Sequence, residues 1–172
     1  MNGKIKAALG VFLGVIALCA YFIVAQKSSA PSISLTTLAG EKLEMNALRG
    51  KVVLVNFWAT SCTTCIKEMP ALIETHHKYA PQGYETLAVA MDYDPPGFVS
   101  AYALKTNLPF KVAHDADGSV AKAFGDIRLT PTTFLVDKQG NIVKRYLGEP
   151  DFAALHAEIE ALLKAPSAHR PN

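Results

Sequence analysis

The stretch VVLVNFWATSCTTCIKEMP, residues 52–70, decides the fold. Six of its first seven residues are apolar and three are the β-branched residue valine, a run that predicts a strand buried on both faces of a sheet. The residues that follow predict a helix over residues 62–79, with Pro70 inside it as the position of an expected kink. Cys62 and Cys65 therefore stand three apart on one face of a helix that begins where a strand ends. A disulfide needs Cα atoms about 4.4 to 6.8 Å apart, so this pair can open and close a bond without moving the backbone.

The flanking sequence predicts alternating strands and helices. Further strands are expected at residues 86–91, 110–113, 133–137 and 142–147, and further helices at residues 98–105, 120–124 and 151–163. A short hairpin is expected over residues 32–44, and Asp151 is expected to cap the last helix. Strand–helix–strand units followed by a hairpin and a terminal helix indicate an α/β fold with a mixed sheet sandwiched between helices.

The N-terminal segment has the pattern of a membrane anchor. Residues 7–25 contain no charge over 19 positions and are preceded by Lys4 and Lys6. About 20 apolar residues cross the hydrocarbon layer as a helix, and lysines on the short N-terminal side favour its retention in the cytoplasm. The alternative is a cleaved signal peptide, since residues 28–30 are small enough for a signal peptidase. We favour an uncleaved single-pass anchor, because the apolar run exceeds the usual signal-peptide core of about 7 to 15 residues and a proline would follow the cut.

These observations divide the chain into five expected parts. They are a cytoplasmic tail at residues 1–6, the anchor at 7–25, a tether at 26–31, one domain outside the cytoplasm at 32–165 and a tail at 166–172. Lys4 and Lys6 account for two of the 17 basic residues, which leaves 15 basic against 15 acidic residues from residue 26 onward. A neutral domain gives no electrostatic case for binding nucleic acid. Its only cysteines are Cys62 and Cys65, so any disulfide within it joins these two.

Three motifs in this order carry a resemblance to a known family. They are VNFWATSCTTC at residues 55–65, Pro70 five residues after the second cysteine, and TPTTFLVD at residues 130–137. Together they resemble the thioredoxin superfamily and, more narrowly, its membrane-tethered TlpA/ResA-like thiol-disulfide oxidoreductases. The resemblance implies a thioredoxin-like three-layer sandwich with a mixed central sheet, preceded by one transmembrane helix.

The resemblance also implies an activity and its partners. It implies exchange of a dithiol or disulfide with protein substrates on the periplasmic or extracytoplasmic side of a bacterial cytoplasmic membrane. The expected direction is reduction, in cytochrome c maturation or in the reduction of a copper-site cysteine, with a CcdA- or DsbD-like membrane protein as the electron donor. The disulfide of Cys62 and Cys65 is expected to be the redox group, with no further cofactor and no metal.

The two cysteines are expected to have different roles. Unpaired N–H groups and the positive end of the dipole at a helix N-terminus stabilise an anion, so we expect a lowered pKa for Cys62, which would be the attacking thiolate. Cys65, one turn further in, would resolve the mixed disulfide. By resemblance, Pro131 would follow a cis peptide bond, Thr130 would pair its backbone with an extended substrate segment, and Trp58 would belong to the substrate-binding surface.

Two positions depart from the thioredoxin pattern. Asn56 stands where thioredoxins have a buried aspartate that relays a proton, and an amide cannot do so. Asp92 and Asp94, which follow the neighbouring strand, are the candidates for that relay. Ser61 replaces a common tryptophan, so the recognition rim around the sulfurs is expected to be less apolar than usual.

Other function classes stay open at this point. A copper- or zinc-binding thiol carrier would need more ligands than two thiolates. His76 and His77 lie about 16 Å further along the helix than the cysteines by helical rise, and only His114 could approach from a loop. A DsbA-like oxidase typically has a histidine between its cysteines and a large helical insertion, whereas this chain has two threonines and a modest insertion over residues 91–126. A peroxiredoxin-type peroxidase needs threonine where this chain has Ala59, and a purely structural cystine is disfavoured because a helix N-terminus makes it reducible.

Overall fold

A computed structural model describes residues 28–166, and its centre is a five-stranded mixed sheet in the order β5-β4-β3-β6-β7. The strands are β3 (Val52–Trp58), β4 (Tyr84–Ala90), β5 (Lys111–His114), β6 (Thr132–Val136) and β7 (Ile142–Leu147). β3 is the middle strand, with β4 and β5 parallel to it on one side and β6 antiparallel to it on the other. The predicted mixed sheet is therefore confirmed, with the stretch that decides the fold at its centre.

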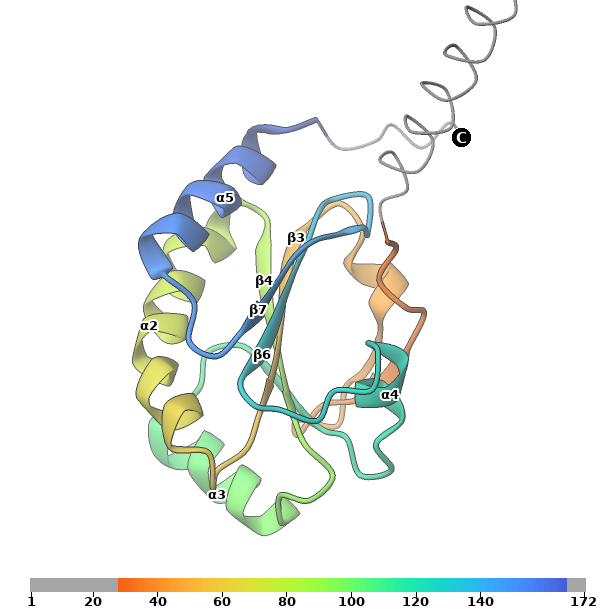
Figure 1. Cartoon of the computed structure of the whole chain (residues 1–172), viewed down its shortest axis with the longest axis vertical. Coiled ribbons are helices and arrows are strands. Elements are labelled where there is room, and N and C mark those ends of the chain that lie inside the picture. The colour runs from red at the N-terminus through yellow and green to blue at the C-terminus, as the bar shows by residue number, and fades with distance from the viewer. Residues whose placement is uncertain (1–27, 167–172) are drawn as a thin grey trace, which may run out of the picture.

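Helices cover both faces of this sheet (Figure 1). One face is covered by α2 (Thr63–Tyr79), α3 (Pro96–Thr106) and α5 (Phe152–Lys164), and a short turn of 3-10 helix, η2 (Ala80–Gln82), follows α2. The other face is covered by α4 (Ser119–Ala123) and the N-terminal part of the domain, which comprises β1 (Ser34–Thr36), β2 (Lys42–Glu44) and η1 (Met45–Leu48). This is the three-layer arrangement that the sequence predicted.

The central strand supplies both hydrophobic cores because its side chains alternate between the faces of the sheet. Val53, Val55 and Phe57 face the layer that contains α4. Leu54 and Trp58 face the layer that contains α2 and α5. All seven residues of β3 are buried, as expected for a strand covered on both sides. The position of the residues that directly follow Trp58 is therefore fixed by this packing.

Local predictions are confirmed at several elements. β1 and β2 pair as an antiparallel hairpin, although each strand is only three residues long. Pro70 lies inside α2, and the helix continues past it to Tyr79. Asp151 caps α5, since its carboxylate accepts hydrogen bonds from the N–H groups of Ala153 and Ala154 at 2.9 and 3.1 Å.

The largest differences from the predictions are at element boundaries. β4 begins at Tyr84, two residues before its predicted start. Glu85 can lie in the strand because Lys51 neutralises it at 3.2 Å, and the ring of Tyr84 packs 6.1 Å from that of Tyr79. α3 begins at Pro96, also two residues early, because proline suits the first turn of a helix where no N–H donor is required.

The predicted transmembrane helix at residues 7–25 lies outside the described residues. Among residues 28–166, no helix has the length and apolar character needed to cross a membrane. The division of the chain into tail, anchor, tether and domain stays a prediction.

α4 offers a test of how the segment before β6 is held. Asp115 is buried, and its carboxylate accepts hydrogen bonds from the N–H groups of Val120 and Ala121 at 3.0 and 2.8 Å. We expect Asp115→Ala to lower the free energy of unfolding by about 2 kcal/mol, because two helix N–H groups lose a charged acceptor. Urea unfolding at pH 7 measures this. Asp117→Ala is the matched control, since Asp117 is exposed and accepts a single backbone hydrogen bond at 3.0 Å, and equal losses in the two variants would contradict the prediction.

Candidate active site

Cys62 and Cys65 form a disulfide at the junction of β3 and α2. Their sulfurs are 2.16 Å apart and their Cα atoms 5.2 Å apart. The Cα distance lies within the range that a disulfide needs, so the predicted pairing of the two cysteines is confirmed. The bond lies beyond the C-terminal end of the central strand, at the point where the sheet changes from parallel to antiparallel neighbours.

The two sulfurs have different surroundings. Cys62 is the N-cap residue of α2 and is partly exposed, and its sulfur accepts a hydrogen bond from the backbone N–H of Cys65 at 3.2 Å. Cys65 has no exposed surface and packs in the core beneath α2. A partner molecule can therefore reach Cys62 directly and Cys65 only through Cys62. The predicted order of attack requires this difference and stays a prediction.

The peptide bond between Thr130 and Pro131 is cis, as the resemblance implied. It lies just before β6, where the carbonyl of Pro131 accepts a hydrogen bond from the N–H of Gly148 at 2.8 Å. Thr130 is partly exposed, and within residues 28–166 its backbone N–H and carbonyl have no hydrogen-bond partner. An extended segment could therefore pair with this backbone, although the roles of Thr130 and Pro131 in substrate binding stay predictions.

Trp58 lies at the end of β3 and is fully buried. Its ring packs 5.4 Å from that of Tyr102 on α3, and its indole N–H has no partner among the described residues. In this structure it packs beneath the active site. Its predicted contact with substrate stays a prediction, and one that would require the indole to become exposed.

Asp92 and Asp94, the predicted relay candidates, lie in the loop after β4. Asp94 is buried, and its carboxylate accepts hydrogen bonds from the N–H and the hydroxyl of Thr60 at 2.6 and 2.5 Å. Asp92 is exposed and accepts a hydrogen bond from the N–H of Tyr93 at 2.9 Å. Asp94 therefore ties its loop to the turn before Cys62, and a relay role for either aspartate stays a prediction.

Sequence reasoning missed a further acid, Glu68, which lies on α2 one turn after Cys65. Glu68 is 1% exposed, and its Oε1 accepts a hydrogen bond at 2.9 Å from the side-chain amide of Asn56. The same amide donates to the hydroxyl of Thr133 on β6, also at 2.9 Å. Asn56 thus stands where thioredoxins have an acid and uses both of its N–H groups to hold the neighbouring acid and strand in place.

The surroundings of Glu68 favour its protonated form. Burial raises the pKa of Glu68 to about 7, the hydrogen bond from Asn56 opposes this rise, and the negative charge of Glu149 adds to it. Glu68 Oε2 and Asn56 Oδ1 are both buried with no partner in the described part of the chain. Carboxylate and amide oxygens are both acceptors, and protonation turns one acceptor of Glu68 into a donor. Near neutral pH, the carboxyl can therefore take up or release a proton.

A sequence signal for Glu68 exists in the helix pattern. The buried face of α2 includes Cys65, Met69 and Leu72, and Glu68 is the acidic residue on that face. Residues three apart on a helix share a face, so the spacing alone places Glu68 on the same face of the helix as Cys65. The pKa of Glu68 could not be inferred in this way, because it depends on burial by other elements.

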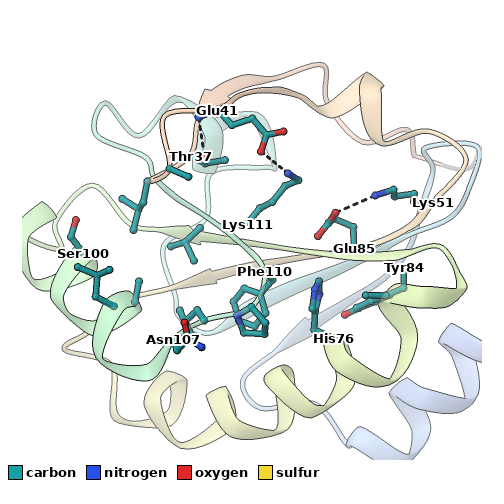
Figure 2. A pocket seen from close by; sticks show the side chains of 18 residues that line it. Thr37, Glu41, Lys51, His76, Tyr84, Glu85, Ser100, Asn107, Phe110 and Lys111 are labelled. Atoms are coloured by element: carbon teal, nitrogen blue, oxygen red, sulfur yellow. Dashed lines mark hydrogen bonds and ion pairs between the residues drawn. The ribbon is translucent and has the colours of Figure 1, made fainter.

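A hollow of about 670 Å³ lies toward the end of the sheet at which β3 and β4 begin (Figure 2). Its walls include His76, Tyr84 and Phe110, and ion pairs of Lys51 with Glu85 and of Lys111 with Glu41 lie at its border. Since Tyr84 begins β4 and β4 is parallel to β3, this hollow is far from the sulfurs at the end of β3. It is therefore separate from the disulfide site.

The histidines that we weighed as metal ligands are dispersed. His76 faces the hollow, where its ring nitrogen lies 3.3 Å from the hydroxyl of Thr86 and where burial lowers its pKa. His114 has its Nε2 atom 2.9 Å from the carbonyl oxygen of Asp94. Among the described residues, no three or more histidine, cysteine, aspartate or glutamate side chains are grouped so that they could hold a metal ion.

Comparison with known proteins agrees with this geometry. The model of the Redoxin family matches residues 25–163. The thiol-disulfide oxidoreductase ResA of Bacillus thuringiensis subsp. konkukian is 41% identical over 123 residues, which are 70% of this chain and 68% of that protein. ResA of Geobacillus thermodenitrificans is 37% identical over 139 residues, which are 81% of this chain and 79% of that protein.

Solved structures show the same fold. A candidate thioredoxin from Neisseria meningitidis has a TM-score of 0.77 and 41% identity, over 84% of this chain and 95% of that one. A thiol:disulfide interchange protein from Chlorobium tepidum TLS has a TM-score of 0.74 and 27% identity, over 81% of this chain and 98% of that one. The fold and the disulfide at a helix N-terminus define a thioredoxin-like thiol-disulfide oxidoreductase. The chain belongs to the Redoxin family, among relatives named ResA.

The raised pKa of Glu68 predicts a change in stability with pH. The pKa of an unfolded glutamate is 4.5 and that of folded Glu68 is about 7, so the folded protein holds an extra proton between these values. Stability conferred by this proton is present at low pH and is lost as the pH rises through 7. Glu68→Gln keeps the acceptor for Asn56 but does not titrate at this position. We therefore expect the free energy of unfolding of the parent, relative to that of the variant, to fall by about 2 kcal/mol between pH 5 and pH 8.

Urea unfolding of the oxidised proteins at these two pH values measures the difference. Glu74→Gln is the matched control, because Glu74 lies on the same helix but is exposed, and we expect it to follow the parent at both pH values. A Glu68→Gln protein whose stability changes with pH in parallel with the parent would show that the carboxyl titrates normally.

Proposed function

We propose that this protein reduces disulfides of protein substrates outside the cytoplasmic membrane, to which residues 7–25 anchor it. One observation carries the proposal: an accessible Cys62 is bonded to a buried Cys65, and an acid with a pKa of about 7, Glu68, follows on the same face of the helix. These are an attacking group, a resolving group and a proton acceptor within the first two turns of one helix.

The reduced protein would begin the reaction with the Cys62 thiolate. Its sulfur attacks one sulfur of a substrate cystine, so that a mixed disulfide forms and the substrate S–S bond breaks. The released substrate sulfur leaves as a thiolate and takes a proton from water. The N-cap position of Cys62 supports this step, because the backbone N–H groups of the first turn stabilise negative charge on its sulfur.

Cys65 would complete the reaction. Its buried thiol transfers a proton to the Glu68 carboxylate, and the resulting thiolate attacks the sulfur of Cys62. The bond between Cys62 and the substrate breaks, and the second substrate sulfur leaves as a thiolate. The substrate has then gained two electrons, and the enzyme is left with the disulfide that the structure contains.

The substrate would lie beside the cis peptide bond. Thr130 has a partly exposed backbone with both hydrogen-bonding groups free in the described part of the chain, and β6 continues from it in an extended conformation. An extended segment on either side of the substrate cystine can pair with these groups as a short added strand.

The direction and the partners follow from the family and the anchor. The relatives are named ResA, and the two threonines between the cysteines differ from the histidine of DsbA-like oxidases. We propose a CcdA- or DsbD-like membrane protein as the electron donor, and cytochrome c maturation or similar thiol maintenance as the role. Anchoring at residues 7–25 would restrict the enzyme to partners near the membrane and raise their effective concentration.

The potential of the disulfide tests the direction. Equilibration of the full chain with glutathione buffers, followed by trapping of thiols, gives this potential. We expect a value nearer to about −270 mV, as in thioredoxin, than to about −120 mV, as in DsbA. A value near the DsbA end would overturn the proposed direction in favour of oxidation.

Two cysteine variants test the assigned order of attack. We expect Cys62→Ser to abolish insulin reduction by the full chain, because the accessible sulfur is lost. Cys65→Ser should instead accumulate a mixed disulfide with the substrate, because no second thiol remains to release it. Non-reducing gel electrophoresis and mass spectrometry measure the trapped species. Insulin reduction by Cys62→Ser at the parent rate would show that the nucleophile has been wrongly assigned.

A further inference from the structure

The hollow near the start of β4 is separate from the disulfide, and the proposed reaction does not use it. Its volume of about 670 Å³ lies within the range of about 300 to 1,000 Å³ that is typical of small-molecule sites. It is lined by residues of α2, α3 and β5 and by the loop after β1, so segments distant in the chain build it together (Figure 2). The hollow therefore has the size and the walls of a binding site of its own.

Aromatic rings form one wall of the hollow. The ring of His76 lies between those of Phe110 and Tyr84, and its centroid is 5.6 Å from the first and 6.2 Å from the second (Figure 2). Two large apolar side chains stand at the border, Leu104 on α3, which is 82% exposed, and Leu38, which is 40% exposed. A flat ring that enters the hollow can therefore pack against aromatic side chains and cover exposed apolar surface.

A chain of hydrogen bonds fixes which nitrogen of His76 carries the proton. Thr86 has a single hydroxyl proton, which it donates to the phenol oxygen of Tyr84 at 3.1 Å. The same Thr86 oxygen lies 3.3 Å from Nδ1 of His76, so Nδ1–H is the donor in that contact. Burial lowers the pKa of His76, which favours the neutral ring. In a neutral ring with its proton on Nδ1, the Nε2 atom is a hydrogen-bond acceptor.

This acceptor nitrogen has no hydrogen-bond partner within residues 28–166. His76 is only 8% exposed, and it lines the hollow. Its Nε2 atom is nevertheless not among the unpartnered side-chain atoms that are sealed from solvent. The free acceptor is therefore reached from the hollow, where a ligand can satisfy it by donating a hydrogen bond.

The charged side chains at the border of the hollow are paired with one another. Lys51 lies 3.2 Å from Glu85, and Lys111 lies 2.6 Å from Glu41 (Figure 2). Each pair joins one positive and one negative charge, so the two pairs add no net charge to the border. This balance favours a neutral ligand over an ion.

We propose that this hollow binds a neutral, flat molecule of one or two aromatic rings that carries an N–H or O–H donor. The rings pack against His76, Phe110 and Tyr84, and the donor bonds to Nε2 of His76. His76 lies in the last turn of α2, whereas the cysteines lie at the start of that helix, so binding involves no step of thiol chemistry. The inference goes beyond the proposed function and does not depend on it.

Indole and 1-methylindole test the site, because they differ by a methyl group that removes the N–H donor. Titration of the oxidised full chain in a mild detergent, followed by NMR of backbone amides and histidine ring nitrogens, locates each probe and gives its Kd. The detergent takes up each probe equally in the parent and in a variant, so this uptake cancels when their preferences for indole over 1-methylindole are compared. We expect saturating shifts at the amides of Leu104 and Lys111 and at Nε2 of His76.

His76→Phe keeps an aromatic ring but loses the acceptor. We expect its preference for indole to be about fivefold smaller than that of the parent, since one neutral hydrogen bond is worth about that factor. His77→Phe is the matched control, because His77 is exposed and lies outside the walls of the hollow, and its preference should equal that of the parent. Leu104→Ser should weaken both probes about threefold, because it removes apolar contact but no acceptor. The exposure of Leu104 keeps this test valid if His76→Phe fails to fold.

Each contrary outcome overturns a stated part of the inference. The absence of saturating shifts around the hollow, or unchanged affinity of Leu104→Ser for both probes, would overturn the site. Shifts centred instead on Tyr93 and Thr130, whose hydroxyls lie 3.2 Å apart at the cis peptide bond, would do the same. An equal preference for indole in the parent and in His76→Phe, or a His76 ring with its proton on Nε2, would overturn the proposed class of ligand. Insulin reduction by the parent measures the proposed function separately.

Discussion

The burial of β3 on both faces is the constraint on which the rest of the structure depends. Val53, Val55 and Phe57 hold the strand to one helical layer, while Leu54 and Trp58 hold it to the other, so its end has a fixed position and direction. α2 begins within a few residues of that end, and the sulfur of its N-cap residue points back to the first turn. The chemistry at Cys62 therefore depends on packing in the middle of the sheet, because that packing decides where the unpaired N–H groups of the helix are aimed.

A second consequence of this packing is the buried contact between Asn56 and Glu68. Asn56 faces the α2 layer from β3, and its amide joins the acid of that helix to Thr133 of the neighbouring strand. An amide in this position carries no charge of its own, so it orients the carboxyl without competing for its proton. In the mechanism that we propose, the proton-accepting group lies on the helix that bears the cysteines and not on the strand, where thioredoxins have it.

How much the sequence could predict depended on whether a feature is local. The buried strand, the cysteines at a helix start and the cap at Asp151 are encoded by neighbours in the chain, and all three were predicted. The role of Glu68 was missed because its pKa is set by burial and by residues distant in the chain. Its partner Asn56 lies 12 residues before it, and Asn56 in turn is bonded to Thr133, 77 residues further along the chain. The contact between Tyr93 and Thr130 spans 37 residues and was missed for the same reason. The non-local features predicted in advance, the mixed sheet in three layers and the cis bond at Pro131, match the family resemblance, which implied both.

The hydrogen bonds of Asp94 bear on what happens when the disulfide opens. The disulfide between Cys62 and Cys65 closes a loop between residues only three apart, so its reduction restores little conformational freedom to the chain. The carboxylate of Asp94 fastens the loop after β4 to the turn at Thr60, and the hydroxyl of Tyr93 joins that loop to Thr130. Breaking the S–S bond therefore removes none of these contacts directly, because none of them involves a sulfur atom.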